Sequence, residues 1–391
     1  MQDFCDTRHS VTGQHGAKCP RATCFEGHVP AQDILSRSRV WLIDDLPAAK
    51  AVSDSVTTER AANGVFSAVR DQALWRRIRA SGVVLTLSLL GASLLAATAG
   101  SFWLGDLAVH FPVQYAGLGL VAFAVLLVAR RPAWGALALA VAAFNAMSAA
   151  PALATRPPAA LPAAVHAAAD AVHLRVASIN VLYTNSEFQR VADFIHHEHP
   201  DTMVLVEMTP EWRKALAVAE RDYPYRYQTL AGSGRGVDMW SRLPMKDVGV
   251  LPIEARQEPA IQATLLAHGR SLRLFGVHAS WPMAPGSARR RNHQFELLAQ
   301  QARATTTLPL LIVGDLNVSP FSPHFHQLLV DGGLRSAANG YGWQPTWPSF
   351  LPLAGIQIDH ALVNPAVTVQ SFRRGEGDGS DHRPIIVDVV L

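Results

Sequence analysis

The chain is poor in charged residues. Only 17% of its 391 residues are Asp, Glu, Lys or Arg, whereas about 25% is usual in soluble domains. The shortage is local, because Asp106 is the single residue of these four types between Ser81 and Ala129. We therefore expect this part of the chain to lie in lipid.

The chain is also poor in cysteine, and its three cysteines all lie within the first 24 residues. This distribution excludes a disulfide framework from the rest of the chain. Cys19, Cys24 and His28 have a spacing similar to that of a zinc knuckle, but no fourth ligand is evident, and a disordered tail is the alternative. Residues 1–75 show no sustained periodicity and are predicted to be mostly disordered, and a misassigned start codon is a further explanation for them.

Three uncharged segments are predicted to be transmembrane helices, at about 82–104, 112–129 and 133–150. The first has 23 residues and would reach roughly 34 Å, enough for a hydrocarbon core of about 30 Å. The third is half alanine, and a surface helix or a buried helix of a soluble protein is the alternative for it. Small residues are also what closely packed membrane helices place at their contacts.

Arginines set the predicted orientation. They precede the first segment and separate the second from the third (Arg70, Arg76, Arg77, Arg79, Arg130, Arg131). The positive-inside rule places them in the cytoplasm. Three crossings of the inner (plasma) membrane then deliver the rest of the chain to the periplasmic or extracellular side, and the side reverses if the third segment does not cross. Residues 151–171 are a Pro/Ala-rich linker, so the predicted catalytic domain is 172–391.

Polar residues follow apolar strands at several places in this domain. The strands predicted at 173–180, 202–206, 272–277 and 308–313 run into Asn180, Glu207, His278 and Asp315. Asp381 and His382 directly precede a fifth strand, predicted at 383–390. Five strand termini of this kind predict one shared site, whereas independent turn residues are the alternative. The order of strands, helices and hairpins favours a mixed α/β sandwich of two sheets with outer helices.

The motifs around these strand ends resemble the endonuclease/exonuclease/phosphatase superfamily, which has the DNase I-like fold, over roughly residues 173–391. They are SIN at 178–180, LVEM at 205–208, GVDMWSRLP at 236–244, FGVHA at 275–279, VGDLN at 313–317, IDH at 358–360 and GSDHRPI at 379–385. The resemblance implies a four-layer α/β sandwich of two packed mixed sheets flanked by helices. Three spans before such a domain also look like a membrane-anchored bacterial subgroup.

The resemblance implies hydrolysis of a phosphate ester with a divalent metal, usually Mg²⁺, with Mn²⁺ as the alternative. Glu207 would bind the metal, with Asn180 and Asp381 beside it. His382 would act on the attacking water and would be oriented by Asp359. Independently of any family, a hard cation prefers oxygen ligands of these kinds.

The same resemblance assigns three further site residues. His278 would contact the scissile phosphate or assist the leaving group, while Asp315 and Asn317 would position the water and the phosphate. Arg291 and Asn292 are predicted to bind the substrate, because the basic segment that contains them could hold a second phosphate. A solvated helix start is the alternative for that segment.

Two neighbouring residues are expected to lie outside the site. Strand alternation turns His360 away from Asp359. Asp238 stands where relatives of the superfamily have a small or apolar residue, and a structural contact is favoured for it over a place in the site.

The charge balance bears on the substrate. Residues 172–391 contain 20 Lys and Arg against 20 Asp and Glu, so the domain lacks the basic excess of a nonspecific nuclease. A bilayer anchor favours a phospholipid or another envelope phosphoester, although a nuclease stays open because 289–291 are three arginines. A non-catalytic, membrane-displayed phosphate-binding or scaffold module is the other alternative. No protein partner is predicted.

Overall fold

The computed structural model describes residues 47–391 except 156–170, 230–233, 254–258 and 306, and it describes the backbone alone for 47–70. The chain divides into two units, Met1–Ser67 and Ala68–Leu391, and the account below concerns the second. The candidate zinc knuckle at Cys19, Cys24 and His28 and most of the predicted linker 151–171 lie outside the described residues.

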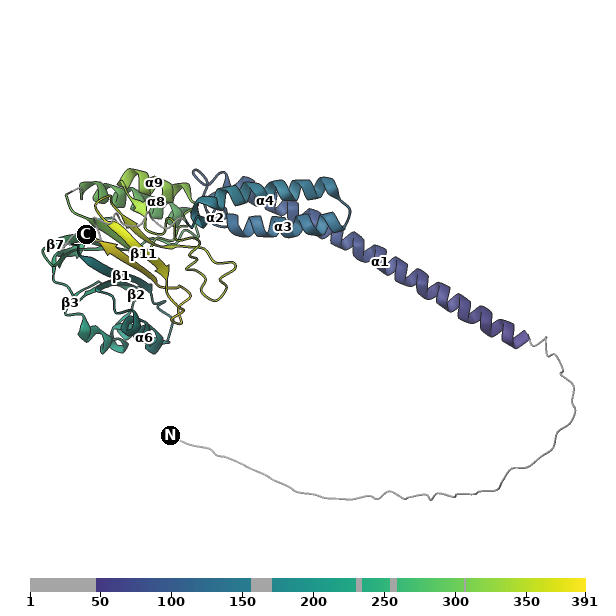
Figure 1. The fold of residues 1–391 in the computed structure, drawn as a ribbon, viewed down its shortest axis with the longest axis horizontal. Helices are drawn as coiled ribbons and strands as arrows, with labels where there is room; N and C mark the ends of the chain where they lie inside the picture. The colour runs from purple at the N-terminus through teal and green to yellow at the C-terminus, as the bar shows by residue number, and fades with distance from the viewer. Residues whose placement is uncertain (1–46, 156–170, 230–233, 254–258, 306) are drawn as a thin grey trace, which may run out of the picture. The chain divides into compact units, whose positions relative to one another are not determined.

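Two six-stranded sheets form the centre of the domain that follows the apolar helices (Figure 1). The first has the order β11 (Thr368–Arg374), β12 (Ile385–Val390), β1 (His173–Asn180), β2 (Thr202–Met208), β4 (Gly236–Ser241) and β3 (Tyr225–Gln228). The second has the order β5 (Met245–Val250), β6 (Ile261–Ala267), β7 (Arg270–His278), β8 (Leu310–Asp315), β10 (Asp359–Val363) and β9 (Arg335–Ser336). Both sheets are mixed, because β1 is parallel to β2 and β7 to β8, whereas the other pairs are antiparallel.

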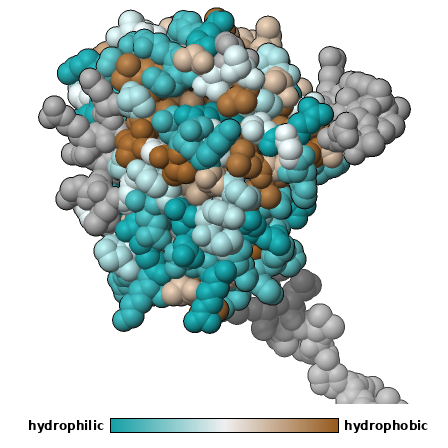
Figure 2. Space-filling view, turned by 90° about the vertical axis from the view of Figure 1, so that its left-hand side faces the viewer, coloured by the Kyte–Doolittle hydropathy of each residue, from teal (hydrophilic) through white to brown (hydrophobic). Residues whose placement is uncertain are grey.

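Helices cover the outer face of each sheet. The first sheet carries α6 (Phe188–Glu198), α7 (Pro210–Ala215) and the 3₁₀ turn η1 (Ala219–Asp222), and the second carries α8 (Pro285–Ala304) and α9 (Pro323–Gly332). One hydrophobic core lies between the sheets and one lies beneath each helical layer. This arrangement is the predicted four-layer sandwich. The face in Figure 2 is mostly hydrophilic, with smaller hydrophobic groups across its middle.

Strand β8 shows how the sequence produces these layers. Its residues Leu310–Asp315 are all buried, which requires apolar side chains on both faces. Leu311 and Val313 belong to the core between the sheets, whereas Leu310 and Ile312 pack in the core beneath α8 and α9. Side chains alternate along a strand, so Asp315 continues the face that points between the sheets.

The N-terminal helices are α1 (Pro47–Ala96), α2 (Trp103–Ala108), α3 (Pro112–Val128) and α4 (Pro132–Leu153). Helices α1, α3 and α4 pack together around Ala122, Leu126 and Ala138 (Figure 1). Residues 47–75, predicted to be mostly disordered, are therefore helical in the structure.

Three membrane-spanning helices were predicted, but among the described residues only two helices are long and apolar enough to cross a membrane. Asp71–Ala96 and Pro132–Leu153 have 26 and 22 residues and are apolar enough to cross a membrane. The middle helix α3 has 17 residues, because it is bounded by Pro112 and by the turn before Pro132, and it would reach only about 26 Å.

The first predicted span, 82–104, was displaced from the observed helix. Helix α1 ends at Ala96, and the chain turns before α2 begins at Trp103. Gly105 permits this turn, because a Cβ atom there would lie 2.6 Å from the backbone oxygen of Leu95. The chain therefore folds back over the end of α1 instead of extending it.

Candidate active site

The predicted residues of the second sheet converge because they continue one face of it. His278, Asp315 and Asp359 have the same strand parity as residues of the core between the sheets. His278 pairs with Asp315 in the register of β7 and β8, and Asp315 pairs with Asp359 in that of β8 and β10. The site therefore lies at the edge of the inter-sheet core, where apolar side chains give way to polar ones.

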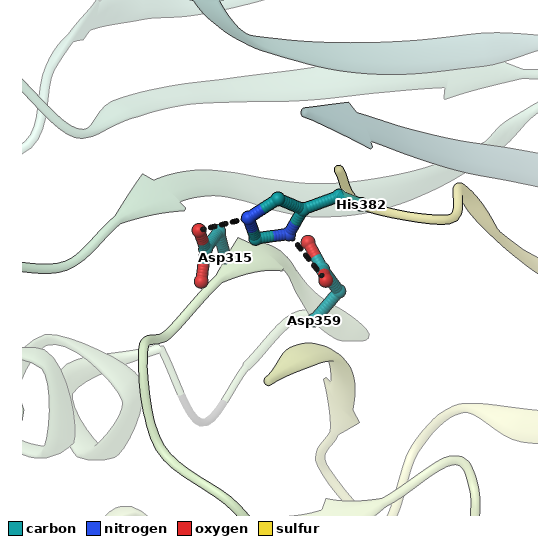
Figure 3. Close-up of side chains that lie close together, drawn as sticks. All are labelled: Asp315, Asp359 and His382. Carbon is teal, nitrogen blue, oxygen red and sulfur yellow. Dashed lines mark hydrogen bonds and ion pairs between the residues drawn. The ribbon is translucent and has the colours of Figure 1, made fainter. Parts of the chain in front are cut away.

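His382 lies between two carboxylates (Figure 3). Its Nδ1 is 2.9 Å from Asp359 Oδ2, and its Nε2 is 3.7 Å from Asp315 Oδ2. All three side chains are buried. The contact with Asp359 fixes the imidazole ring, so that Nε2 is the nitrogen directed at Asp315.

Burial and the charges of neighbouring side chains shift the pKa values of this cluster. Burial would lower the pKa of His382, but the carboxylates of Asp359 and Asp315 outweigh it and raise that pKa to about 10. Burial raises the pKa of Asp315 to about 6. The cluster therefore favours an imidazolium beside carboxylates when no other cation is present.

Asn180 connects the first sheet to this cluster. Its Nδ2 donates a hydrogen bond to Asp315 Oδ2 at 3.2 Å. Its Oδ1 accepts a hydrogen bond from the backbone N–H of Leu182. The amide therefore joins β1 of the first sheet to β8 of the second.

Glu207 reaches the site through an irregular backbone. Strand alternation alone would place its side chain on the outer face with Met203 and Leu205, which pack under α6 and α7. The pairing of β2 with β4 shifts between Val206 and Met208, and Glu207 has a φ of 64°. A bulge of this kind re-aims a side chain at a functional site.

The Glu207 carboxylate contacts three groups near the cavity. Its Oε2 accepts a hydrogen bond from the backbone N–H of Tyr183 at 3.1 Å and lies 3.8 Å from Arg235 Nη1. Its Oε1 is 4.0 Å from His278 Nε2, which is also 3.7 Å from Asp315 Oδ2. His278 thus lies between Glu207 of the first sheet and Asp315 of the second.

The turn after β8 needs an unusual backbone. Gly314 has a φ of 149°, and a Cβ atom there would lie 1.8 Å from the backbone oxygen of Val277. Asn317 also has a positive φ, of 49°. Its backbone N–H donates to Asp315 Oδ1, and its Nδ2 donates to the backbone oxygen of Ala279. The glycine and the two amide contacts hold the VGDLN turn against β7.

A cavity of about 840 Å³ opens onto these side chains. Six of the predicted site residues line it: Glu207, His278, Asp315, Asn317, Asp381 and His382. Asp359 and Asn180 stand behind this lining and contact His382 and Asp315. The structure therefore brings all eight predicted catalytic and metal-binding residues into one region.

The oxygen atoms around the cavity suit a hard divalent cation. Glu207 and Asp381 present carboxylates to the cavity. Asp381 Oδ2 accepts a hydrogen bond from Trp347 Nε1, whereas Oδ1 is buried and has no hydrogen-bond partner among the described residues. Asp315, Asp359 and His382 form a second cluster that could hold an ion, with ligand atoms within 4.8 Å of one another. None of these residues is a cysteine, the ligand that would favour zinc.

The two predicted substrate-binding residues are not part of the cavity lining. Arg291 is completely buried and its Nη2 binds Asp106 Oδ2, while its Nη1 donates to the backbone oxygen of Asn317. Asn292 accepts hydrogen bonds from Arg291 through Oδ1 and contacts His324. A buried ion pair with Asp106 therefore takes the place of the expected contact with substrate, and the neighbouring Arg290 lines the cavity.

The ion pair also shifts the pKa of Asp106. Burial would raise that pKa, but the Arg291 guanidinium and the Ser322 hydroxyl lower it below its ordinary value. Asp106 therefore stays ionised beside Arg291.

The two residues expected outside the site are outside it. Asp238 is buried in a bidentate contact with Arg213, at 2.7 and 2.9 Å, which confirms its structural role. His360 packs on Phe325 and its Nε2 lies 2.8 Å from the backbone oxygen of Val318. Burial lowers the pKa of His360 to about 4.

Several residues of the cavity were missed from the sequence. Arg235 immediately precedes the GVDM motif, and this position is the only feature of the sequence that indicates a place in the cavity. Leu107, His110 and Phe111 also line the cavity, although they follow the first apolar helix. Nothing local in the sequence marks them, because only the fold brings this turn to the two-sheet domain.

Comparisons with known proteins agree with this geometry. Residues 177–382, more than half of the chain, match the endonuclease/exonuclease/phosphatase family. No curated protein sequence gives a match.

A search of solved structures finds similarity to the following three, among others. An endonuclease/exonuclease/phosphatase family protein from Bacteroides thetaiotaomicron has 18% identity and a TM-score of 0.48, over 56% of this chain and 98% of that one. TDP2 from D. rerio, complexed with a single-strand DNA product, has 16% identity and a TM-score of 0.48, over 56% and 98%. A family protein from Beutenbergia cavernae has 20% identity and a TM-score of 0.46, over 56% and 72%.

The family match spans the strand ends whose side chains surround the cavity. The chain therefore belongs to the endonuclease/exonuclease/phosphatase family and has its phosphoesterase fold, with a buried Asp/His cluster.

Proposed function

We propose that this protein is a membrane-anchored phosphoesterase that hydrolyses a phosphate ester with the help of a divalent cation, Mg²⁺ or Mn²⁺. The observation that carries the proposal is the position of His382. Its ring is held by Asp359 and faces Asp315, at a cavity that Glu207 and His278 also line. This set supplies a proton carrier, its orienting group and negative oxygens at one place.

His382 acts on the attacking water. A base must lie near the water and must be held in one orientation, and Asp359 provides the orientation through Nδ1. Asp315 and Asn317 position the water and the phosphate group, since both line the cavity beside His382. His278 contacts the scissile phosphate or supplies a proton to the leaving oxygen, as its Nε2 lies near both Glu207 and Asp315.

The cation is assigned to Glu207, Asn180 and Asp381, where it would neutralise phosphate charge and polarise the P–O bonds. The alternative cluster of Asp315, Asp359 and His382 has suitable spacing. However, Asp359 Oδ2 and His382 Nδ1 already bond each other. An ion at that place would break the contact that orients the base.

The membrane anchor is supported by the exposure of the apolar helices. In the most apolar stretch of each helix, only 22% of Asp71–Ala96 and 28% of Pro132–Leu153 are buried against the rest of the protein. A core helix of a soluble protein would be mostly buried. Arg79 contacts the backbone oxygen of Ala129, which places the basic residues of α1 beside the α3–α4 turn. The basic residues thus gather at one end of the packed helices, while α2 and Gln114 contact the catalytic domain at the other. The positive-inside rule then favours a catalytic domain on the periplasmic or extracellular side.

The test uses the full chain, purified in detergent, with bis-p-nitrophenyl phosphate as a diester and p-nitrophenyl phosphate as a monoester. We expect Mg²⁺- or Mn²⁺-dependent release of nitrophenol that EDTA abolishes. The His382→Ala variant should lose about 10² to 10⁴ in rate.

The competing function is a non-catalytic phosphate-binding module. Such a module would bind inorganic phosphate but would hydrolyse neither ester. Activity that persists in EDTA or in His382→Ala would instead contradict the proposed mechanism.

A further inference from the structure

One wall of the cavity comes from the N-terminal part of the chain. The turn between the first two apolar helices contributes Leu107, His110 and Phe111 to the lining, alongside the catalytic groups. Burial lowers the pKa of His110 to about 4, so this wall carries no charge at neutral pH. The lining also includes Trp281, Pro282 and Met283, together with Arg235 and Arg290.

The turn is firmly attached to the catalytic domain. Asp106 pairs with Arg291 and accepts a hydrogen bond from Ser322 Oγ at 2.7 Å. His110 Nδ1 is 2.8 Å from Ser319 Oγ. These contacts are buried, so the apolar helices fix one side of the cavity in place.

A second segment presents apolar side chains beside the same cavity. Phe350, Leu351 and Leu353 are 77%, 51% and 91% exposed. They lie in the chain between Trp347 and Ile356, which both line the cavity. We call residues 347–356 the apolar rim loop.

Contacts locate the apolar rim loop at the end of the helices. The backbone oxygen of Gly355 accepts a hydrogen bond from Gln114 Nε2 at 2.8 Å, and Gln114 is in the first turn of α3. Aromatic residues gather at this end of the apolar helices (Phe102, Trp103, Phe111, Tyr115). Aromatic side chains of this kind are enriched where membrane helices meet the headgroups. The loop therefore stands at the level of the bilayer surface if the helices span it.

The lack of charged residues in these two segments also fits a position at the bilayer surface. Residues 347–356 contain no Asp, Glu, Lys or Arg, and the turn 97–111 contains only Asp106, which Arg291 neutralises. A site for a polyanion such as nucleic acid would need a basic rim. An uncharged, apolar rim instead matches a substrate that remains partly in lipid.

We propose that the cavity takes the phosphoester headgroup of a membrane lipid, which reaches it from the bilayer between the turn 97–111 and the apolar rim loop. This inference rests on the proposed phosphoesterase function. The polar strand ends hold the phosphate. Leu107, Phe111 and the rim contact the glycerol and acyl portion of the lipid.

The experiment compares lipid and soluble substrates with the full chain reconstituted in phosphatidylcholine vesicles. The lipid substrates are phosphatidylglycerol, a diester, and phosphatidic acid, a monoester, and the readout is the release of water-soluble product. The soluble substrates are bis-p-nitrophenyl phosphate and a single-stranded oligonucleotide. The tested variant is Phe350→Ser with Leu353→Ser, whose side chains are exposed and do not line the cavity.

We expect the double variant to lose at least about tenfold in lipid hydrolysis, because exposed apolar side chains favour partition into the bilayer where a lipid substrate lies. Its turnover of the soluble bis-p-nitrophenyl phosphate should change less than about twofold. Val218→Ser is the matched control, since Val218 is 73% exposed and does not line the cavity. It should alter neither rate.

Three results distinguish the lipid substrate, the role of the rim and the phosphoesterase function. Hydrolysis of bis-p-nitrophenyl phosphate or the oligonucleotide without hydrolysis of either lipid would overturn the lipid substrate and leave the phosphoesterase function standing. Equal effects of the double variant on lipid and soluble substrates would overturn the role of the rim. No hydrolysis of any substrate would reject the proposed function itself.

Discussion

Arg291 of α8 and Asp106 of α2 form an ion pair across 185 positions of the chain, and neither side chain reaches solvent. Arg291 also donates to the backbone oxygen of Asn317, a residue of the cavity. The pair thus joins three segments: the turn between the apolar helices, the helix behind the second sheet and the turn after β8. The two-sheet domain and the apolar helices are in this way structurally interdependent.

Removal of one partner of this ion pair should be strongly destabilising. Asp106→Ala leaves the buried Arg291 guanidinium without a carboxylate, which costs about 3–5 kcal/mol at typical buried pairs. The double variant Asp106→Leu with Arg291→Met should recover much of that loss, because it leaves no buried charge. Thermal unfolding in detergent, followed by tryptophan fluorescence, measures both variants.

A surface ion pair is the control for this experiment. Arg190 and Glu187 lie 3.4 Å apart and are both exposed, so Arg190→Ala should change stability by about 1 kcal/mol or less. Equal losses for Asp106→Ala and Arg190→Ala would contradict the buried pair.

The orientation of His382 by Asp359 should be visible in the kinetics. Asp359→Asn keeps the shape of the side chain but removes its charge, so we expect a loss of about 10² to 10⁴ in kcat with a smaller change in KM. The double variant Asp359→Asn with His382→Ala should be little worse than His382→Ala, because both changes disable the same base. Asp331→Asn, an exposed change on α9, is the control. Additive losses in the double variant would show that the two residues act separately.

The pH dependence of stability should report the same cluster. Without metal, the folded-state pKa of His382 is about 10, above its ordinary value of 6.5. Protonated His382 therefore contributes stability that is fully present below pH 6.5 and is lost as the pH rises toward about 10. Unfolding midpoints in EDTA should fall more between pH 7 and pH 10 for the wild type than for His382→Gln. Parallel curves for the two proteins would exclude a raised pKa for His382.

The backbone of the VGDLN turn should tolerate no side chain at its glycine. Gly314→Ala brings a Cβ atom within 1.8 Å of the Val277 oxygen at a φ of 149°, so we expect a loss of more than about 2 kcal/mol. At Gly249 of β5 a Cβ atom meets no other atom within 4 Å. Gly249→Ala should therefore lie within about 0.5 kcal/mol of the wild type. Similar unfolding midpoints for the two variants would contradict the close approach of β7 and β8.

Much of the site could be predicted because strand alternation is a local property. In β8, β7 and β10, the parity of the apolar residues directs Asp315, His278 and Asp359 to one face, and it directs His360 to the other. Glu207 was predicted from its motif and not from parity, which would have turned it outward. Its place depends on a bulge and a positive φ that no pattern of apolar residues encodes.

Arg291 shows where local reasoning failed. Three successive arginines at the start of a helix resemble a phosphate-binding group. Their roles depend on which residues face them in the fold, and that information lies 185 positions away at Asp106. The predicted end of the first apolar helix was wrong for a related reason. Helix α1 ends where Gly105 packs against its last turn, and this contact is not visible in the local sequence.

The sequence by itself determined the two-sheet sandwich, the apolar helices and the chemical types of the side chains at the strand ends, since each follows from periodicity and residue type over short stretches. Only the tertiary structure decided that His382 lies between Asp359 and Asp315, that Arg291 is paired with Asp106, and that the turn beside α2 forms a wall of the cavity. These relationships join residues far apart in the chain, and distance in space is set by packing of the whole fold and not by local preference.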